Sequence, residues 1–268
     1  MLKTCLDKSA VKRSFSRAAS TYDDFADFQY EAAKEVSDAL KELLPEGGDG
    51  KGISVLDIGC GTGSLAELIL PSLPGARVFG CDLAFPMLRR AGEKLGQRLT
   101  GLAVADCEAL PFRDASFDSA VSSLTYQWAG DLSSAFAEAC RVLKPGGLFA
   151  LSTLGPGTLS ELKECYPGYR GLEFKASDEV LNEAERAGLE VISADKRLVK
   201  KVYKDFFELL RTLKHIGASP PLERGKGLTP GRELKEAGET YARKFPAEGS
   251  GVIGSYGLMI ITARKKRP

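Results

Sequence analysis

The stretch Val55-Leu56-Asp57-Ile58-Gly59-Cys60-Gly61-Thr62-Gly63 predicts the fold of this chain. An apolar run from Ile53 to Ile58 is typical of a buried strand in a parallel sheet. Three glycines at alternate positions follow, which suits a tight turn that a ligand approaches without meeting a Cβ atom. A helical pattern comes next, with Leu65, Leu68 and Ile69 on one face. Strand, glycine turn and helix together predict a nucleotide-binding βαβ unit, whose helix N-terminus favours a carboxylate or a phosphate.

The spacing of the glycines separates this turn from a dinucleotide site. A dinucleotide site has the pattern G-x-G-x-x-G, whereas this turn has G-x-G-x-G and is preceded by Asp57. That variant resembles the first motif of class I S-adenosylmethionine (SAM) methyltransferases. The alternative is a tight strand-to-helix turn without a ligand, as in any α/β protein, and the turn alone leaves it open.

The composition is that of an ordinary globular protein. The 268 residues suffice for one large α/β domain, or for one domain with an insertion. A net charge of +1 gives no reason to expect a nucleic acid or a membrane as partner, and no apolar run approaches the roughly 20 residues of a membrane-spanning helix. The six cysteines form no C-x-x-C pair, which predicts free thiols, no metal site and a cytoplasmic location. Residues 1–10 do not have the pattern of a signal peptide.

Strands and helices alternate through the middle of the chain. Their patterns predict strands at 76–81, 102–105, 117–123 and 148–153, and helices at 85–95 and 132–143. This alternation predicts a doubly wound parallel sheet. Farther along, the patterns predict helices at 157–165 and 178–187, and strands at 189–199 and 252–263.

Two helical segments lie outside this alternation. An apolar stripe from Asp23 to Leu44 predicts an N-terminal helix. The patterns at 206–216 and 230–245 predict two helices inserted between the last two strands, which we expect to form a substrate lid rather than a stabilising cap. For the segment before the N-terminal helix, two interpretations stay open. Phe15 and Tyr22 are packing residues of the core, or their segment folds over the ligand turn as a lid.

Residues at the ends of three strands are candidate ligand contacts. Asp82 ends the second strand, where a carboxylate can accept two hydrogen bonds from a ribose diol. Asp106 follows the third strand and could accept the exocyclic amine of an adenine, while Cys107 could offer its backbone N–H to the ring. Trp128, the only tryptophan, follows the fourth strand at the edge where open α/β sheets bind ligands. Ordinary strand-end and loop acids are the alternative.

One segment of the chain concentrates basic residues. Seven of them fall within nineteen residues whose only acids are Asp205 and Glu208. Lysines that protect a sheet edge from aggregation are one explanation, and a docking patch for an acidic partner is the other. The seven are Lys196, Arg197, Lys200, Lys201, Lys204, Arg211 and Lys214.

Several motifs together resemble the malonyl-acyl-carrier-protein O-methyltransferases of biotin synthesis, the BioC family, over nearly the whole chain. The segment Arg141–Gly147 carries part of this resemblance, although its residues Leu143–Gly147, like the glycine turn, are shared with many SAM enzymes. The pair Gln127-Trp128 and the segment Leu213–Ala218 are similar to this family in particular. The other matching segments are 15–22, 109–112 and 116–118, together with Leu124.

The resemblance implies a Rossmann-like, doubly wound, mostly parallel sheet of seven strands in a single class I methyltransferase domain. We divide the chain into an N-terminal helical lid (1–52), a SAM-binding core (53–202), a helical insertion or lid (203–249), and the last strand and tail (250–268). SAM is the implied cofactor, held by Asp57, Gly59, Gly61, Gly63, Asp82, Leu83, Asp106, Cys107 and Leu124. The candidate substrate-pocket residues are Arg17, Tyr22, Gln127 and Trp128.

The implied reaction is methyl transfer from SAM to the free carboxylate of a malonyl group carried on acyl carrier protein, an early step of pimeloyl and biotin synthesis. A carboxylate is already ionised at neutral pH, so we expect no general base. We accordingly expect the only histidine, His215, to be a packing or surface residue. Arg17 or a basic residue of the insertion would orient the carboxylate. Two alternatives stay open: a methyltransferase for a small molecule such as a quinone, and a non-catalytic SAM-binding partner subunit.

Overall fold

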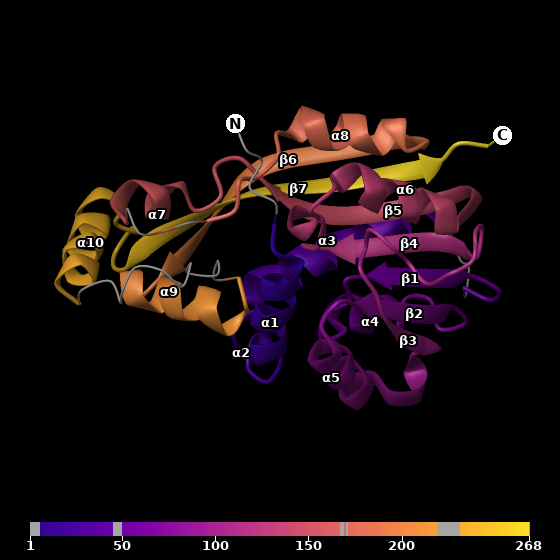
Figure 1. The fold of residues 1–268 in the computed structure, drawn as a ribbon, viewed down its shortest axis with the longest axis horizontal. Coiled ribbons are helices and arrows are strands. Elements are labelled where there is room, and N and C mark those ends of the chain that lie inside the picture. Colours follow the sequence, from indigo (N-terminus) through magenta and orange to yellow (C-terminus); the bar gives the residue numbers. More distant parts are fainter. Residues whose placement is uncertain (1–5, 45–49, 167–168, 170, 219–230, 268) are drawn as a thin grey trace.

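A seven-stranded sheet with helices on both faces forms the centre of the computed structural model, which describes residues 6–44, 50–166, 169, 171–218 and 231–267 (Figure 1). The order across the sheet is β3-β2-β1-β4-β5-β7-β6. The strands are β1 (Ser54–Ile58), β2 (Arg77–Asp82), β3 (Gly101–Val104), β4 (Phe117–Ser123), β5 (Leu143–Gly155), β6 (Leu189–Tyr203) and β7 (Val252–Lys265). The doubly wound, mostly parallel sheet predicted from the sequence is therefore confirmed.

Strand β1 lies where the strand order reverses. It pairs in parallel with β2 on one side and with β4 on the other. All five of its residues are buried, including the charged residue Asp57. Open α/β sheets bind ligands at the carboxyl ends of their strands, at such a point of reversal. The fold thus places the glycine turn after β1 where a ligand site is expected.

The last two strands are antiparallel to their neighbours and longer than the parallel ones. Strand β7 lies between β5 and β6, and its pairing with β6 extends from Leu189–Lys265 to Tyr203–Val252. Both strands run beyond the parallel part of the sheet, and Figure 1 shows helices gathered around their far ends. The sequence predicted the end of β6 four residues too early, because alternating Lys and apolar residues at an exposed sheet edge resemble a polar loop.

The helices occupy both faces of the sheet. They are α1 (Lys8–Ala18), α2 (Tyr22–Phe25), α3 (Asp27–Leu43), α4 (Ser64–Ile69), α5 (Phe85–Leu95), α6 (Leu132–Val142), α7 (Ser160–Cys165), α8 (Ser177–Arg186), α9 (Phe206–His215) and α10 (Gly231–Lys244), with short 3-10 turns η1 (Gly96–Arg98) and η2 (Tyr126–Trp128). The predicted single helix from Asp23 to Leu44 is interrupted at Ala26, which separates α2 from α3. The predicted helix start at Pro230 lies outside the described residues. Among the described residues, no helix is both long and apolar enough to span a membrane.

Two apolar cores lie on opposite faces of the sheet, because alternate residues of a strand point to opposite sides. Val55 packs in the core that includes α3 and α4, whereas Leu56 packs in the core that includes α6 and α8. Phe136 of α6 is fully buried in the second core, where its ring lies 4.9 Å from the ring of Tyr126 and 6.3 Å from that of Phe149. These aromatic contacts fix the turn η2 below the carboxyl end of β4.

We expect Phe136→Ala to lower the free energy of unfolding by about 3–5 kcal/mol, because it leaves a cavity among packed rings. Urea denaturation followed by circular dichroism measures the change. Val202→Ala is the matched control, since the Val202 side chain is 64% exposed and its truncation should stay within about 0.5 kcal/mol. Equal losses in the two variants would contradict the assignment of this core.

Candidate active site

The turn after β1 uses glycine at three left-handed positions. The φ angles are +72° at Gly59, +55° at Gly61 and +86° at Gly63, a region that other residues rarely adopt. The N–H groups of Gly59 and Cys60 both donate to the carbonyl oxygen of Cys81, at 2.8 and 2.9 Å. The end of β2 therefore holds the turn against the sheet.

The surroundings of the three glycines differ, so an added side chain would have different consequences at these positions. A Cβ atom at Gly59 would lie 2.1 Å from Oγ1 of Thr125, and one at Gly63 would lie 2.9 Å from Leu95. A Cβ atom at Gly61 would meet nothing within 4 Å. Packing within the protein therefore requires Gly59 and Gly63 to be small. Only Gly61 opens toward free space, where a ligand can approach the backbone.

Asp57 is a buried carboxylate without a protein partner. It is fully buried at the end of β1, and neither of its oxygens has a hydrogen-bond partner among the described residues. Burial, together with the nearby Asp82 carboxylate, raises the pKa of Asp57 to about 8, and the nearby backbone N–H of Ala66 opposes this rise only in part. A buried carboxylate is stable only with a cationic or hydrogen-bonding partner. The positive charges of SAM fit this requirement, so the residues of the turn suit the cofactor implied by the sequence.

Asp82 connects the turn to the next helix. Its Oδ2 accepts a hydrogen bond from the N–H of Gly61 at 3.0 Å, and its Oδ1 accepts one from the N–H of Ala84 at 2.8 Å. Burial raises the pKa of Asp82, and these two N–H groups oppose the rise. A carboxylate has about four lone-pair sites, so two remain for a ligand hydroxyl. Leu83, half-buried, lies between the two anchored positions.

Asp106 pairs with Lys8, a residue near the N-terminus of the sequence. Its Oδ1 accepts hydrogen bonds from Nζ of Lys8 at 2.7 Å and from the N–H of Glu108 at 3.1 Å. Although burial opposes the change, these contacts lower the pKa of Asp106. Lys8 also lies 2.6 Å from Glu108. Burial raises the pKa of the neighbouring Cys107 thiol to about 12, which leaves its backbone N–H as the group suited to binding.

The acidic cluster at this point has the atoms of a metal site but already contains a cation. Asp106, Cys107 and Glu108 each offer one ligand atom, and these atoms lie within 4.8 Å of one another. The ammonium of Lys8 bonds to both carboxylates. Sequence reasoning missed Lys8, because 98 residues separate it from Asp106 and neither residue carries a local signal of the contact.

The N-terminal segment lies against the carboxyl ends of the strands. The ring of Phe15 meets Trp128 edge-on at 5.3 Å. Thr62 of the glycine turn donates a hydrogen bond to Asp23 at 2.5 Å. Burial, and then the carboxylates of Asp82 and Asp23, raise the pKa of Tyr22. The aromatic residues of this segment therefore pack, and they do so beside the glycine turn. Its role as a lid stays a prediction.

The inserted helix α9 contacts the N-terminal segment. The ring of His215 stacks on Phe25 at 4.3 Å with an angle of 8°, and Thr21 donates a hydrogen bond to the His215 carbonyl oxygen at 3.2 Å. A Cβ atom at Gly217 would lie 3.2 Å from the backbone of Phe15. The segment Leu213–Ala218 therefore joins the insertion to the N-terminal helices, and His215 is a packing residue.

The remaining predicted residues differ in their surroundings. Leu124 has a φ angle of +51°, a strained value for a residue other than glycine, and its N–H donates to Ser152. Oε1 of Gln127 accepts a hydrogen bond from Thr153 at 3.2 Å. Arg17 is exposed on α1 and has no ion pair among the described residues. The structure therefore brings Tyr22 and Trp128 to the strand ends but leaves Arg17 on the surface.

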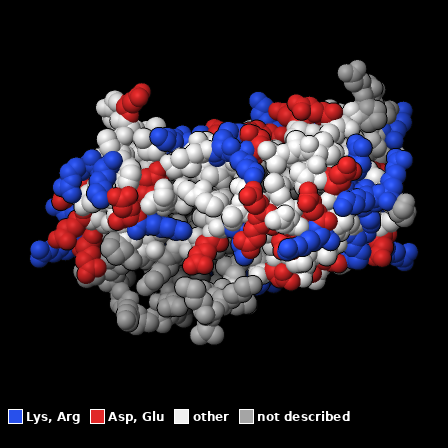
Figure 2. Space-filling view, turned by 90° about the horizontal axis from the view of Figure 1, so that it is seen from above, with Lys and Arg blue, Asp and Glu red and all other residues white. Residues whose placement is uncertain are grey.

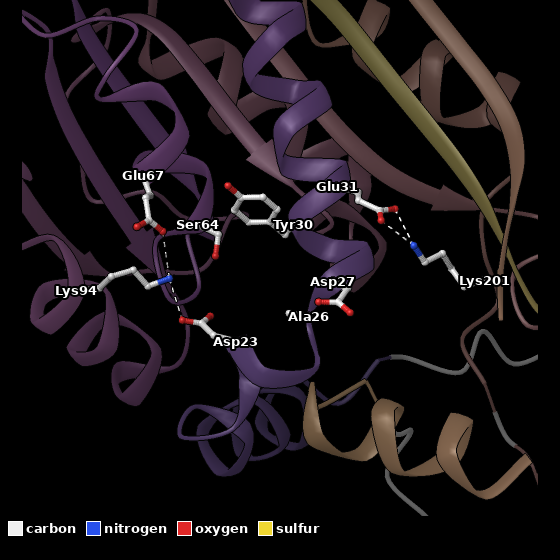
Figure 3. Close-up of a pocket in the computed structure, with 9 residues that line it drawn as sticks. All are labelled: Asp23, Ala26, Asp27, Tyr30, Glu31, Ser64, Glu67, Lys94 and Lys201. Atoms are coloured by element: carbon white, nitrogen blue, oxygen red, sulfur yellow. Dashed lines mark hydrogen bonds and ion pairs between the residues drawn. The ribbon is translucent and has the colours of Figure 1, made fainter. Parts of the chain in front are cut away.

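A cavity of about 430 Å³ opens beside the glycine turn (Figure 3). Its two lysines are ion-paired with acids of its own lining. Figure 3 shows Lys94 directed toward Asp23 and Glu67, and Lys201 directed toward Glu31. The full lining is Asp23, Ala26, Asp27, Tyr30, Glu31, Ser64, Glu67, Lys94 and Lys201. Gln127 lines a second, smaller cavity of about 170 Å³ near α8.

We expect Gly61→Ala to weaken SAM binding by about tenfold or more, because its Cβ would occupy the space open to a ligand. The left-handed backbone should also cost about 1–2 kcal/mol of stability. Gly96→Ala is the matched control, since Gly96 has a φ angle of +53° and open space around it but lies at the far end of α5. Titration calorimetry with SAM should find wild-type affinity in the control. Equal affinities in all three proteins would contradict the ligand position.

We expect Asp57 to make the free energy of unfolding of the ligand-free protein fall as the pH rises. Its pKa rises from the ordinary 3.8 to about 8 on folding. The folded chain therefore binds a proton that the unfolded chain releases, and the free energy of unfolding should fall between about pH 4 and about pH 8. Urea denaturation across this range should show a smaller fall for Asp57→Asn. Asp38→Asn, at an exposed site, should keep the wild-type slope; identical slopes in all three proteins would contradict the assignment.

Known proteins are similar to this chain in sequence and in fold. Residues 56–151 match the family model described as a methyltransferase domain. The malonyl-[acyl-carrier protein] O-methyltransferase of Geobacter sulfurreducens is 37% identical over 253 residues, which cover 90% of this chain and 92% of that protein. The biotin biosynthesis bifunctional protein BioHC of Teredinibacter turnerae is 37% identical over 274 residues, covering 96% of this chain and 47% of that protein.

Solved structures agree in fold at lower identity. A putative methyltransferase of Bacillus halodurans superposes with a TM-score of 0.62 at 20% identity, over 86% of this chain and 98% of that one. The geranyl diphosphate C-methyltransferase of Streptomyces coelicolor, in complex with S-adenosylhomocysteine, superposes with a TM-score of 0.54 at 18% identity, over 85% and 74% of the two chains. These structures show the same fold, and the family model and the sequence relatives assign this chain to the SAM-dependent methyltransferases. More narrowly, its extended similarity to the curated relatives means that it belongs to the malonyl-[acyl-carrier protein] O-methyltransferase family.

Proposed function

We propose that this protein transfers a methyl group from SAM to the free carboxylate of a malonyl group on acyl carrier protein, at an early step of pimeloyl and biotin synthesis. The family relationship supports the substrate, and the unpartnered Asp57 beside an open glycine turn supports the cofactor. In this proposal the protein works in the cytoplasm without a metal ion, and its partner is neither a nucleic acid nor a membrane.

Residues at the ends of β1 to β4 would hold the cofactor. The backbone at Gly61 and the carboxylate of Asp57 would meet its methionine portion, and Asp82 would accept hydrogen bonds from its ribose. Asp106 and the Cys107 backbone would meet its adenine. Gly59, Gly63, Leu83 and Leu124 would shape the surrounding pocket. When bound, SAM supplies an electrophilic methyl group on a positively charged sulfur.

The nucleophile needs no base from the protein. A carboxylate titrates near pH 4 and is ionised at neutral pH. The ring of His215 is stacked on Phe25, and its Nδ1 lies 3.3 Å from Oγ1 of Thr21. The protein's contribution would be to align the two reactants and exclude water, because opposite charges that neutralise one another react faster in a dry site. The packing of Phe15 on Trp128, with the half-buried Tyr22 nearby, provides apolar cover over the strand ends.

Gln127 is a candidate to orient the substrate carboxylate. Because its Oε1 accepts the hydrogen bond from Thr153, its two N–H donors remain for a ligand. Arg17 would serve this role only if α1 or the substrate brought the guanidinium inward from its exposed position. Gln127 would therefore make the direct contact with the carboxylate, and Arg17 a supporting one.

We expect the purified protein to form a base-labile methyl ester on malonyl-carrier protein when supplied with methyl-labelled SAM. With both substrates saturating, kcat should change little between about pH 6 and about pH 9, since the carboxylate stays ionised throughout. Acetyl-carrier protein, which lacks the free carboxylate, is the matched control and should accept no label. SAM binding without label transfer would favour a non-catalytic subunit. Transfer to a quinone alone would favour the small-molecule enzyme.

A further inference from the structure

Helix α1 carries four basic residues and no acidic one, in the sequence Lys8-Ser-Ala-Val-Lys12-Arg13-Ser-Phe-Ser-Arg17-Ala. Two like-charged pairs, Lys8 with Lys12 and Arg13 with Arg17, stand four residues apart. Such pairs each destabilise a helix by about 0.2–0.5 kcal/mol. These repulsions lower the stability of α1. The four basic residues are therefore better explained by groups that they bind than by a contribution to the helix.

Only one of the four cations faces the protein interior. Lys8 bonds to Asp106 and Glu108, and the buried residues Ala10, Val11 and Ala18 define the inner side of α1. Lys12, Arg13 and Arg17 are exposed and form the outer face of α1. Among the described residues, only Arg13 has an acidic neighbour, Asp7 at 3.4 Å, and both side chains are more than half exposed. A pair that exposed neutralises little of the field.

The basic segment on β6 and α9, by contrast, is largely neutralised within the chain. Lys196 pairs with Asp178, Lys201 with Glu31 and Arg197 with Glu35. Arg211 lies 3.9 Å from Asp205. Figure 2 likewise shows Lys and Arg intermixed with Asp and Glu over the face that it draws. The edge strand β6 thus uses several of its basic residues to hold neighbouring elements, which favours the structural explanation for that part of the segment.

The outer face of α1 lies beside the site of the reaction. On its inner side, the same helix places Lys8 on Asp106 and Phe15 on Trp128. A partner seated on this face would therefore be next to the carboxyl ends of β3 and β4. A substrate delivered on a carrier protein needs such a seat close to the entrance of the site.

We propose that the outer face of α1 is the docking surface for the carrier protein, and that it recognises a patch of Asp and Glu residues on that partner. The inference rests on the proposed function, because it takes a carrier-bound thioester as the substrate. Opposite charges on the two surfaces speed encounter and fix orientation more than they add affinity. Docking at this face would set the malonyl group next to the strand ends.

The test compares Lys12→Glu/Arg13→Glu with Lys200→Glu/Lys204→Glu. Both pairs are exposed and basic, and both double variants change the net charge equally, but Lys200 and Lys204 lie on β6 and its following turn. Each protein is assayed with malonyl-carrier protein and with the malonyl thioester of a short thiol. We expect the α1 variant to raise the KM for malonyl-carrier protein about tenfold, with kcat and the short-thioester activity within about twofold of wild type. The β6 variant should match wild type on both substrates.

Salt provides a second measurement. The wild-type KM for malonyl-carrier protein should rise with ionic strength, because exposed charges are screened over about 8–10 Å, and the α1 variant should show little further rise. An unchanged KM in the α1 variant, an equal rise in the β6 variant, or an equal loss on both substrates would overturn the docking surface while leaving the proposed function intact. Failure of the wild type to methylate either substrate would overturn the proposed function, and the docking inference with it.

Discussion

Hydrogen bonds between the glycine turn and the end of β2 fix the geometry on which the active site depends. The N–H groups of Gly59 and Cys60 donate to Cys81, and the N–H of Gly61 donates to Asp82. Three left-handed residues in a row of five would otherwise be free to take many conformations. Because hydrogen bonds tie the turn to Cys81 and Asp82 of β2, the turn takes a single conformation. The backbone at Gly61 and the carboxylate of Asp82 are therefore placed together before any ligand arrives.

Charge is distributed asymmetrically around this turn. Its floor contains the buried Asp57 and the half-buried Asp82, both with raised pKa values. Helix α1, beside the neighbouring strand end, has four basic residues and no acidic one, and its Lys8 pairs with Asp106. An acidic floor suits a cationic methyl donor, and the exposed basic face of α1 suits an acidic partner. The acidic groups thus lie at the strand ends, whereas Lys12, Arg13 and Arg17 of α1 face away from them.

Local sequence patterns predicted most of the core. The apolar run of β1, the glycines after it and the acid at the end of β2 each depend on neighbouring residues, so the motif could be interpreted without knowing the rest of the chain. The contacts that the sequence did not reveal join distant residues. Thr125 explains why Gly59 has no side chain, and Lys8 supplies the partner of Asp106. Neither leaves a periodic signal, because each depends on how separate elements pack.

The exposed edge of the sheet and the N-terminal helices were harder to predict for a different reason. The polar residues of β6 resemble a loop until their ion pairs to α3 and α8 are known. The break at Ala26 occurs within an uninterrupted helical pattern without a helix-breaking residue, and α2 before it contacts the glycine turn through Asp23. For Arg17 too, the residue type suggested a substrate contact, whereas only the packing of α1 shows that its side chain is exposed.

The stacking of His215 on Phe25, with Gly217 pressed against Phe15, unites two covering elements that nearly 200 residues separate. Displacing either one would break the contacts of both. The N-terminal helices and the end of α9 therefore form one packed unit built from two distant segments of the chain. A substitution that loosens one of these segments would therefore also loosen the other, so the stability effects of changes at Phe25 and His215 would not add independently.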